Sequence, residues 1–272
     1  MTTADTYTAV VPTYERPDLL PLCLAALTAV APSPTHILVS EGSTNDVARK
    51  TTADIVASFG DGVTLLPEPP EGNLCGNRNH LVRHVATDIL LMIDDDLSVH
   101  EAFPGIALRL LHTGQVEIVT QAHQPLWFTF RGHWRVRKPG DACGISLRCV
   151  MGATDTFRDH PFDEAIVYGS EDLDFCLALG NARVVSTTLT PKDNSEGGIA
   201  RYTPRAREKL ANNSRVLVGI RRYWTSRPRL VTFILLELGA SLLGRTPFPR
   251  QCHKGQWTAT AKAIVGMKAA RP

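Results

Sequence analysis

Three consecutive carboxylates, Asp94, Asp95 and Asp96, directly follow a run of five apolar residues, Ile89–Ile93. Such a run is long enough for a buried strand. Like charges this close repel one another and tolerate burial badly unless a cation neutralises them. The pattern therefore indicates a divalent metal site at the C-terminal end of a strand. An acidic loop that is open to solvent and caps the next helix would have the same sequence.

Short apolar runs alternate with helical patterns along the first half of the chain. The predicted strands and helices are, in order, 7–11, 18–30, 36–40, 46–58, 63–66, 76–86 and 89–93. This alternation is typical of a parallel sheet with helices on both faces. Ligands of such sheets bind at the carboxyl ends of the strands. We therefore expect residues 12–16, 41–43 and 94–96, which directly follow three of the strands, to line a site.

The composition is that of an ordinary globular protein, with 272 residues, 43% of them hydrophobic and 21% charged. This length suffices for one α/β domain with an appendage. The N-terminus lacks a basic segment followed by an apolar one, so no secretory signal is predicted. Six cysteines without a CxxC pair indicate reduced thiols in a cytoplasmic protein rather than a disulfide framework or a zinc site.

Charge is distributed unevenly along the chain. Residues 1–200 carry 14 Lys/Arg and 25 Asp/Glu, whereas residues 201–272 carry 15 and 2. We therefore expect two parts, an acidic domain over 1–200 and a basic helical extension over 201–272. The cations of the extension either balance the acidic body or attract an anionic membrane surface, an acidic acceptor or a phosphate-rich ligand.

The extension contains two predicted helices, 204–224 and 230–243. The second is apolar over 14 residues except for Glu237, and it is too short to span a bilayer. Arginines flank it on both sides. This helix therefore packs on the catalytic body, forms a homodimer contact or makes a peripheral membrane contact, and the sequence leaves these three roles open.

Five motifs in order resemble the inverting family 2 nucleotide-sugar glycosyltransferases. They are Val-Val-Pro-Thr-Tyr-Glu-Arg-Pro-Asp-Leu-Leu (10–20), Leu-Val-Ser-Glu-Gly-Ser-Thr-Asn-Asp (38–46), Gly-Asn-Arg-Asn-His-Leu (76–81), Ile-Asp-Asp-Asp (93–96) and Phe-Asp-Glu followed by Gly-Ser-Glu-Asp-Leu-Asp-Phe-Cys-Leu (162–177). The resemblance covers most of residues 7–200. It implies the GT-A fold, a Rossmann-like, mostly parallel α/β sheet with helices on both faces, here with a helical C-terminal extension. It also implies transfer of a sugar from a UDP or dTDP donor to an acceptor hydroxyl with inversion.

The resemblance implies which residues bind the nucleotide sugar. They follow the first, second and fourth strands or lie on the third helix: Pro12, Thr13, Tyr14, Glu15, Glu41, Arg78, Asp94 and Asp95. Thr13 and Tyr14 would contact the base and ribose, and Glu41 would accept a hydrogen bond from a pyrimidine N3–H. Ser40-Glu41 stands where many members have two aspartates. Arg78 would lie near the diphosphate, which suits a guanidinium because it stays charged and offers forked donors, although a solvated helix arginine is the alternative.

The aspartates correspond to the D-x-D pattern of the family. The resemblance implies that Asp96 ligates Mg²⁺ or Mn²⁺ directly and that Asp94 contacts ribose or a metal-bound water. Many relatives add a histidine ligand after a later strand, but residues 184–195 contain no histidine. Asp193 would supply an oxygen there instead, Lys192 would contact phosphate, or the segment is a surface turn.

The Glu171-Asp172 pair resembles the acidic dyad of the family at the start of a helix on the acceptor side. This implies that Asp172 is the general base and that Glu171 contacts the acceptor or the metal. Acids in a first helical turn are also stabilised by the helix dipole alone. Earlier in the chain, Trp127 and Trp134 form an acceptor platform, or they pack into the core of a hairpin. Gly144 would permit close approach of the substrate.

Two other classes of protein share parts of this pattern. A nucleotidyltransferase has related sheet topology and acidic metal residues, but it would need a phosphate-attack site rather than a base helix. A non-catalytic nucleotide-sugar-binding protein would not need both a metal ligand and a base. The expected partners are a nucleoside diphosphate sugar and a hydroxyl acceptor, with no nucleic acid.

Overall fold

The computed structural model describes residues 6–67, 69, 73–121, 126–135, 142–179, 184–195 and 204–242. The chain divides into two compact units. Unit 1 consists of Met1–Pro125, Ile145–Phe162 and Ala178–Arg201, and unit 2 consists of Leu126–Gly144, Asp163–Leu177 and Tyr202–Pro272. The C-terminal helices thus group with two segments from the middle of the chain, and the division predicted at residue 200 stays a prediction.

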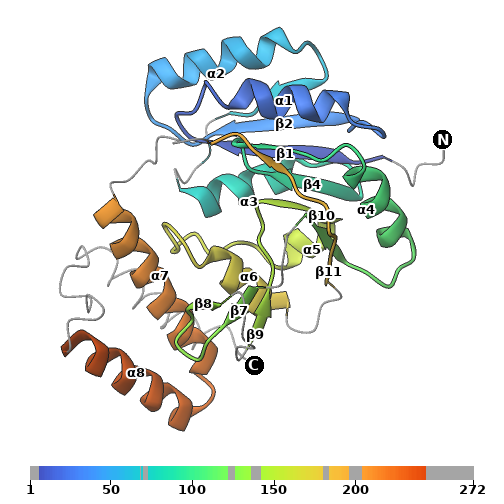
Figure 1. Cartoon of the computed structure of the whole chain (residues 1–272). Helices are drawn as coiled ribbons and strands as arrows, with labels where there is room; N and C mark the ends of the chain where they lie inside the picture. The colour runs from blue at the N-terminus through green and yellow to red at the C-terminus, as the bar shows by residue number, and fades with distance from the viewer. Residues whose placement is uncertain are drawn as a thin grey trace. The chain divides into compact units, whose positions relative to one another are not determined.

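Unit 1 is built on a seven-stranded sheet in the order β11-β6-β10-β4-β1-β2-β3 (Figure 1). Its strands are β1 (Thr8–Thr13), β2 (His36–Glu41), β3 (Val63–Leu65), β4 (Ile89–Ile93), β6 (Ile118–Thr120), β10 (Cys149–Ala153) and β11 (Val184–Ser186). Neighbouring strands are parallel except at β10, which runs antiparallel to β4 and β6. The mostly parallel α/β fold is confirmed, and the four predicted strands end within two residues of their expected positions.

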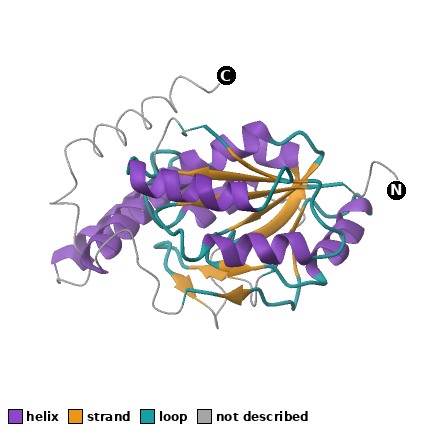
Figure 2. Cartoon of the chain, turned by 90° about the horizontal axis from the view of Figure 1, so that it is seen from above, coloured by secondary structure: helices purple, strands orange, loops and turns teal. Residues whose placement is uncertain are grey.

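Helices cover both faces of this sheet, as Figure 2 shows. They are α1 (Leu20–Ala29), α2 (Asp46–Ser58), α3 (Leu74–His84), α4 (Phe103–His112) and α5 (Thr154–Asp159). Local chemistry explains where several of them begin. The side chains of Asn45 and Asn73 cap α2 and α3 by accepting hydrogen bonds from first-turn amides. Proline occupies the first turn of α1 and α4, where an amide hydrogen is not needed.

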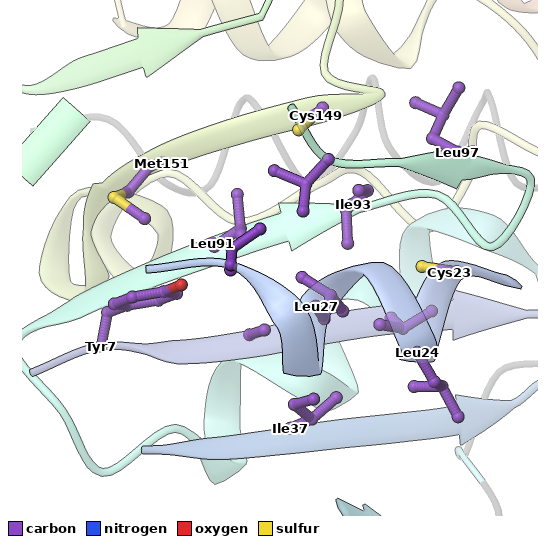
Figure 3. Close-up of a cluster of buried hydrophobic side chains, with 14 of the residues drawn as sticks. Tyr7, Cys23, Leu24, Leu27, Ile37, Leu91, Ile93, Leu97, Cys149 and Met151 are labelled. Atoms are coloured by element: carbon purple, nitrogen blue, oxygen red, sulfur yellow. The ribbon is translucent and has the colours of Figure 1, made fainter. Parts of the chain in front are cut away.

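The core of unit 1 lies between the sheet and the helices α1, α2 and α4. Leu24 and Leu27 of α1 pack against alternate residues of the central strands, among them Ile37, Leu91 and Ile93 (Figure 3). Because side chains of a strand alternate between faces, the intervening residues point to the opposite face, and they are buried as well. This burial on both faces explains why the strands appear in the sequence as unbroken apolar runs.

A second, two-stranded sheet lies beyond the end of β4. It pairs β5 (Leu97–Ser98) antiparallel with β12 (Lys192–Asp193). Lys192 and Asp193 are exposed, but they belong to a strand pair rather than to the surface turn that the sequence allowed. This pairing brings Asp193, which is far away in the sequence, next to Leu97, the residue that directly follows Asp96.

Unit 2 combines a small antiparallel sheet with helices. The sheet has the order β8 (Trp134–Arg135), β7 (Leu126–Phe128), β9 (Ala142–Gly144), and the helices are α6 (Glu171–Leu179), α7 (Pro204–Tyr223) and α8 (Arg227–Leu242). The two predicted C-terminal helices are confirmed, although α8 begins three residues earlier than expected. Pro228 lies in its first turn, where proline is tolerated. No helix in the described part of the chain is long and apolar enough to cross a membrane.

Aromatic contacts hold α7 and α8 together. Tyr223 stacks on Phe130 with ring centroids 4.4 Å apart, and the Tyr223 hydroxyl donates to the carbonyl of Phe130 (2.9 Å). Phe233 of α8 packs so closely over Gly219 of α7 that a Cβ there would overlap the ring. A glycine at this position therefore lets the two helices approach each other.

Candidate functional site

The aspartate triplet, Asp94–Asp96, forms a tight turn between β4 and β5. The amide of Leu97 donates to the carbonyl of Asp94 (3.1 Å) and closes this turn. Thr13, the last residue of β1, donates its hydroxyl hydrogen to Asp95 Oδ2 (2.6 Å). Because β1 and β4 are parallel neighbours, their C-terminal ends meet at one edge of the sheet.

Two arginines from unit 1 reach the triplet from opposite directions. Arg16 lies just after β1, and its Nη1 donates to Asp95 Oδ1 (3.2 Å) and Asp96 Oδ2 (3.0 Å). Arg78, on α3, donates from Nη2 to Asp94 Oδ1 (3.0 Å). The Arg78 side chain is buried and its guanidinium lies 5.3 Å from the ring centroid of Phe162, so it is not a solvated helix arginine. A contact between Arg78 and phosphate stays a prediction.

Arg148 is a third arginine at the triplet, and the sequence analysis did not identify it. Its Nη2 donates to Asp96 Oδ1 (3.0 Å), and its Nε lies 3.7 Å from Asp94 Oδ2. The antiparallel register of β10 with β4 puts Cys149 opposite Ile93, so that the amide of Asp94 donates to the carbonyl of Arg148 (2.8 Å). The only signal in the sequence is an arginine directly before an apolar run. The register that brings it to the aspartates is a tertiary feature.

Asp193 joins the same cluster through Arg148. Its Oδ2 accepts from Arg148 Nη1 (3.1 Å), and the amide of its neighbour Asn194 donates to the carbonyl of Asp96 (2.8 Å). Hydrogen bonds from Ser195 lower the pKa of Asp193. The carboxylate therefore stays ionised next to the triplet, and its role as a metal ligand stays a prediction. We call Asp94–Asp96, Asp193, Arg16, Arg78 and Arg148 the donor-side ion cluster.

Burial opposes ionisation within the triplet. Desolvation raises the pKa of Asp95 to about 7, although Arg16 and Thr13 pull it down. Desolvation also raises the pKa of Asp94 against the pull of Arg78 and Arg148. Three arginines therefore do not fully compensate the cost of holding these carboxylates in a protein interior. A further cation would stabilise their charged forms.

The carboxylate oxygens of the triplet are suited to Mg²⁺ or Mn²⁺ that is held jointly with a substrate. Carboxylate oxygens of Asp94 and Asp96 are ligands that hard cations prefer, and Mg²⁺ is commonly held by one or two carboxylates together with substrate phosphates. Among the described residues no group of three or more His, Cys, Asp or Glu side chains is arranged to hold a metal alone. The chain would therefore supply only part of such a site, and arginines hold the same oxygens in this structure.

The predicted nucleotide-binding residues lie at the ends of β1 and β2. Pro12 and Thr13 are buried, Tyr14 is half-buried and Glu15 is exposed. Glu41 ends β2 directly opposite Thr13 in the parallel register. The structure thus brings these five residues to the same sheet edge as the aspartate triplet, while their contact with a nucleotide stays a prediction.

Glu41 ties the loops after β1 and β2 together. Its Oε1 accepts from the amides of Ser43 (2.9 Å) and Glu15 (3.3 Å), and its Oε2 accepts from the Thr52 hydroxyl (3.0 Å). The Ser43 hydroxyl in turn donates to Glu15 Oε1 (2.6 Å). Glu15 has a φ of 53°, which non-glycine residues rarely adopt. These bonds therefore hold an unfavourable turn in place, and recognition of a base by Glu41 stays a prediction.

Asn77 of α3 fixes the same two strand ends from the opposite side. Its side-chain amide donates to the carbonyls of Thr13 (3.3 Å) and Ser40 (3.0 Å). A Cβ on Gly42 would lie 3.2 Å from that amide nitrogen and 3.6 Å from the Tyr14 ring. A glycine in the loop after β2 therefore lets the backbone lie close to both side chains without a tight contact to Asn77. In the sequence, Asn77 is recognisable only as a member of the Gly-Asn-Arg-Asn motif.

The acidic dyad lies in unit 2 at the start of α6. Gly169 and Ser170 both have positive φ (72° and 66°), and this left-handed turn sets the direction of the helix that begins at Glu171. One oxygen each of Glu171 and Asp172 is buried. Burial raises the pKa of Asp174, one turn further on, to about 6. The base role of Asp172 stays a prediction.

The predicted acceptor residues Trp127, Trp134 and Gly144 lie on the small sheet of unit 2. Phe128 pairs with Trp134 and Leu126 with Gly144, so β7 is flanked by the other two strands. The side chains of Trp127 and Trp134 are outside the described part of the structure. Their backbone positions agree with a hairpin, and neither the platform nor the core packing is tested.

A family model described as glycosyl transferase family 2 matches residues 8–138. This match assigns residues 8–138 to glycosyl transferase family 2, and solved structures share the GT-A fold with the chain. A search of curated proteins gives no match.

The mannosyltransferase PcManGT from Pyrobaculum calidifontis, solved in complex with GDP-Man and Mn²⁺, gives a TM-score of 0.54 at 14% identity. The matched region covers 95% of this chain and 79% of the PcManGT chain. Glucosyl-3-phosphoglycerate synthase from Mycobacterium tuberculosis, in complex with Mn²⁺, UDP and phosphoglyceric acid, gives 0.54 at 13% identity, covering 80% and 78%. S. aureus TarS 1–349 gives 0.51 at 14% identity, covering 81% and 72%. At such identities the likeness shows the fold.

Proposed function

We propose that this glycosyltransferase moves a hexosyl group from a nucleoside diphosphate sugar of the UDP or dTDP type to an acceptor hydroxyl, with inversion. The observation that carries the proposal is the donor-side ion cluster at the C-terminal ends of β1 and β4. It combines carboxylates for a divalent cation with arginines for phosphate, next to the loops after β1 and β2. Structures of the same fold have been solved with GDP-Man or UDP and Mn²⁺, which supports a nucleotide-sugar donor.

In the donor half, each group has a defined task. Asp96 would hold Mg²⁺ or Mn²⁺, with Asp94 and Asp193 beside it, and the bound metal would neutralise the leaving diphosphate. Arg148 is suited to bind a phosphate oxygen, because its side chain is 43% exposed and remains protonated near carboxylates. Thr13 and Arg16 fix the orientation of Asp95 and Asp96 from the end of β1.

In the acceptor half, Asp172 would take the proton of the attacking hydroxyl. The acceptor oxygen forms a bond to the anomeric carbon while the bond from that carbon to the phosphate oxygen breaks on the opposite face. A single attack from the opposite face inverts the configuration, so one carboxylate base is enough. Glu171 would lie beside the acceptor or the metal, and Trp127, Trp134 and Gly144 would bind the acceptor.

Asp172→Asn tests the base assignment. It should lower kcat by a factor on the order of 10² to 10⁴ and leave donor affinity nearly unchanged, because general-base catalysis acts in the chemical step. Donor affinity is measured separately by calorimetry with the nucleoside diphosphate. A kcat close to that of the original chain would move the role to Glu171 or Asp174.

A thermal-shift screen of nucleoside diphosphates and their sugars, with and without Mn²⁺, tests the donor class. Ligands that bind the native state raise the apparent melting temperature. UDP or dTDP should raise it more than GDP does, and Mn²⁺ should increase the shift. A preference for nucleoside triphosphates would favour a nucleotidyltransferase instead, and binding of nucleotide sugars without any turnover would favour a non-catalytic binding protein.

We also propose a cytoplasmic location. The four cysteines in the described residues, Cys23, Cys75, Cys149 and Cys176, are free thiols, and the first three are buried. Free thiols are typical of a reducing compartment. A homodimer through the C-terminal helices and a peripheral membrane contact remain the two proposed interactions of unit 2.

A further inference from the structure

Helix α8 exposes a continuous aliphatic surface. Its members are 38–63% exposed and form the α8 aliphatic face: Val231, Ile234, Leu235, Leu236 and Leu238. Four of them recur at positions i, i+3, i+4 and i+7, which is the spacing of one side of a helix. Exposed aliphatic side chains are normal when they are scattered singly, whereas a contiguous group marks an interaction surface.

The opposite side of α8 is already packed. Phe233, Glu237 and Ala240 are buried there. Glu237 Oε2 accepts from Arg215 Nη2 (2.6 Å), and its Oε1 accepts from Arg131 Nε (2.6 Å). The one acid that interrupts this apolar helix in the sequence is therefore turned inward and neutralised. The outward face carries no acidic side chain.

Positive charge lies at the N-terminal end of this face and, in the sequence, directly after the helix. Arg227 and Arg229 are exposed in the first turn of α8. In the sequence, residues 243–272 follow the helix directly and contain six Lys/Arg and no Asp/Glu. An aliphatic stripe flanked by arginines has the composition of a helix that lies in the plane of a lipid interface, with arginines at the level of the headgroup phosphates.

We propose that the α8 aliphatic face docks onto an anionic lipid surface. Charge favours this occupant over a second copy of the chain, because a symmetric contact would bring two strongly cationic segments together. An anionic bilayer supplies both the opposite charge and an apolar layer for the exposed side chains. The inference goes beyond glycosyl transfer and does not depend on it.

Co-sedimentation of the full-length protein with vesicles tests the proposal. We expect binding to vesicles that contain phosphatidylglycerol, and little binding to pure phosphatidylcholine. Raising the salt concentration should weaken the binding, because exposed charges are screened within about 8 Å at physiological ionic strength. The double variant Arg227→Gln/Arg229→Gln should bind on the order of 25-fold more weakly, at about fivefold for each cation near the surface.

The double variant Val231→Gln/Leu235→Gln removes two aliphatic side chains without changing charge, and it should lose most vesicle binding. Val47→Gln is the matched control, because Val47 is 74% exposed on α2 of unit 1. Glutamine is a good helix former, so all these variants should keep their melting temperatures. The control should bind vesicles like the original chain.

Three results would overturn the proposal. The first is absence of binding to anionic vesicles by the original chain, and the second is binding by Val231→Gln/Leu235→Gln equal to that of Val47→Gln. The third is a dimer in size-exclusion chromatography that the aliphatic variants convert to a monomer while vesicle binding stays absent. That result would assign the face to a second copy. Nucleoside diphosphate binding measured on the same variants reports separately on the proposed function.

Discussion

Two clusters of carboxylates and arginines, one taken from each unit, are built in opposite ways. The donor-side ion cluster of unit 1 has four carboxylates for three arginines, and Arg148 and Asp193 are 43% and 49% exposed. In unit 2 a single buried carboxylate, Glu237, is held by two arginines, Arg131 and Arg215. The first cluster is short of positive charge and reaches solvent through Arg148 and Asp193, whereas the second has a surplus of positive charge around a buried carboxylate.

The pKa values express this difference. In unit 1, desolvation outweighs the arginines and raises the pKa of Asp95 to about 7. In unit 2, burial also favours the neutral form of Glu237, but hydrogen bonds from Arg215 and Arg131 outweigh it and lower its pKa to about 2. A site that binds a further cation must leave its carboxylates incompletely stabilised, while a structural ion pair must not. We infer that the unit 1 cluster serves binding and that the unit 2 cluster serves folding.

Asp96→Asn is the change that should break the function of the unit 1 cluster most completely. It removes the presumed metal ligand while keeping a side chain of the same shape, so turnover should fall by a factor on the order of 10³ or more. The Mn²⁺-dependent part of donor binding, measured by calorimetry, should disappear. Asp61→Asn, in an exposed loop of the same unit, is the control. Normal turnover of Asp96→Asn with added Mn²⁺ would refute the metal assignment.

Glu237→Gln should break the unit 2 cluster, and its effect is on stability. It leaves Arg215 buried without its carboxylate, which costs about 3–5 kcal/mol of unfolding free energy. All four tryptophans lie in the segments of unit 2, so urea unfolding followed by tryptophan fluorescence reports on this unit. The proposed nucleotide-binding residues of unit 1 are unchanged, so the nucleoside diphosphate affinity of the folded protein should be the same.

The pH dependence of that difference gives a second test. A carboxylate whose pKa is lowered in the folded state contributes stability above its unfolded pKa and loses it as the pH falls through the folded value. The stability advantage of Glu237 over the glutamine variant should therefore be full above about pH 4.5 and shrink toward pH 2. A difference that does not change over this window would mean that Glu237 contributes through packing rather than through its charge.

Local pattern explains what could be predicted of both regions. The strands and helices of unit 1 up to Ile93 are strongly patterned, since β1, β2 and β4 are buried on both faces and each helix has its own start signals. The location of the aspartate triplet at the sheet edge was predictable because it directly follows one of these strands, β4. Arg148 was not, because it reaches the triplet through an antiparallel register between strands that are more than fifty residues apart. Glu237 appeared in the sequence only as an interruption, since its partners Arg131 and Arg215 are tertiary neighbours.

Arg148→Gln removes one positive charge from the unit 1 cluster, so it tests how the balance of charge in that cluster affects binding. If these carboxylates hold the metal as proposed, the Arg148 guanidinium would compete with a divalent cation for Asp94, Asp96 and Asp193 in the absence of nucleotide. Removing it should tighten Mn²⁺ binding on the order of tenfold, since one charge near 4 Å in a partly exposed site is worth about 1–4 kcal/mol. Binding of UDP should weaken because a hydrogen-bond donor to its phosphates is lost.

Paramagnetic resonance of free Mn²⁺ in a titration of the nucleotide-free protein measures the first effect. Arg158→Gln is the matched control, because its side chain is also 43% exposed and pairs with Asp155 on the surface of the same unit. It should leave Mn²⁺ affinity unchanged. Weaker Mn²⁺ binding in Arg148→Gln would mean that the arginine organises the carboxylates rather than competing for them.

Asp193→Ala should have the smallest effect, and it tests whether Asp193 takes part in metal binding by the unit 1 cluster. Asp193 is half-exposed and joins the cluster only through Arg148, so its charge is well screened by water. If it supplies a metal oxygen in place of the usual histidine, the Mn²⁺ concentration for half-maximal activity should rise severalfold while kcat at saturating metal stays nearly the same. Asp193→Asn, which keeps an oxygen at that position, should restore part of the affinity. An unaltered metal titration in both variants would assign Asp193 to holding Arg148 in place, and the metal would then depend on the triplet and the donor phosphates alone.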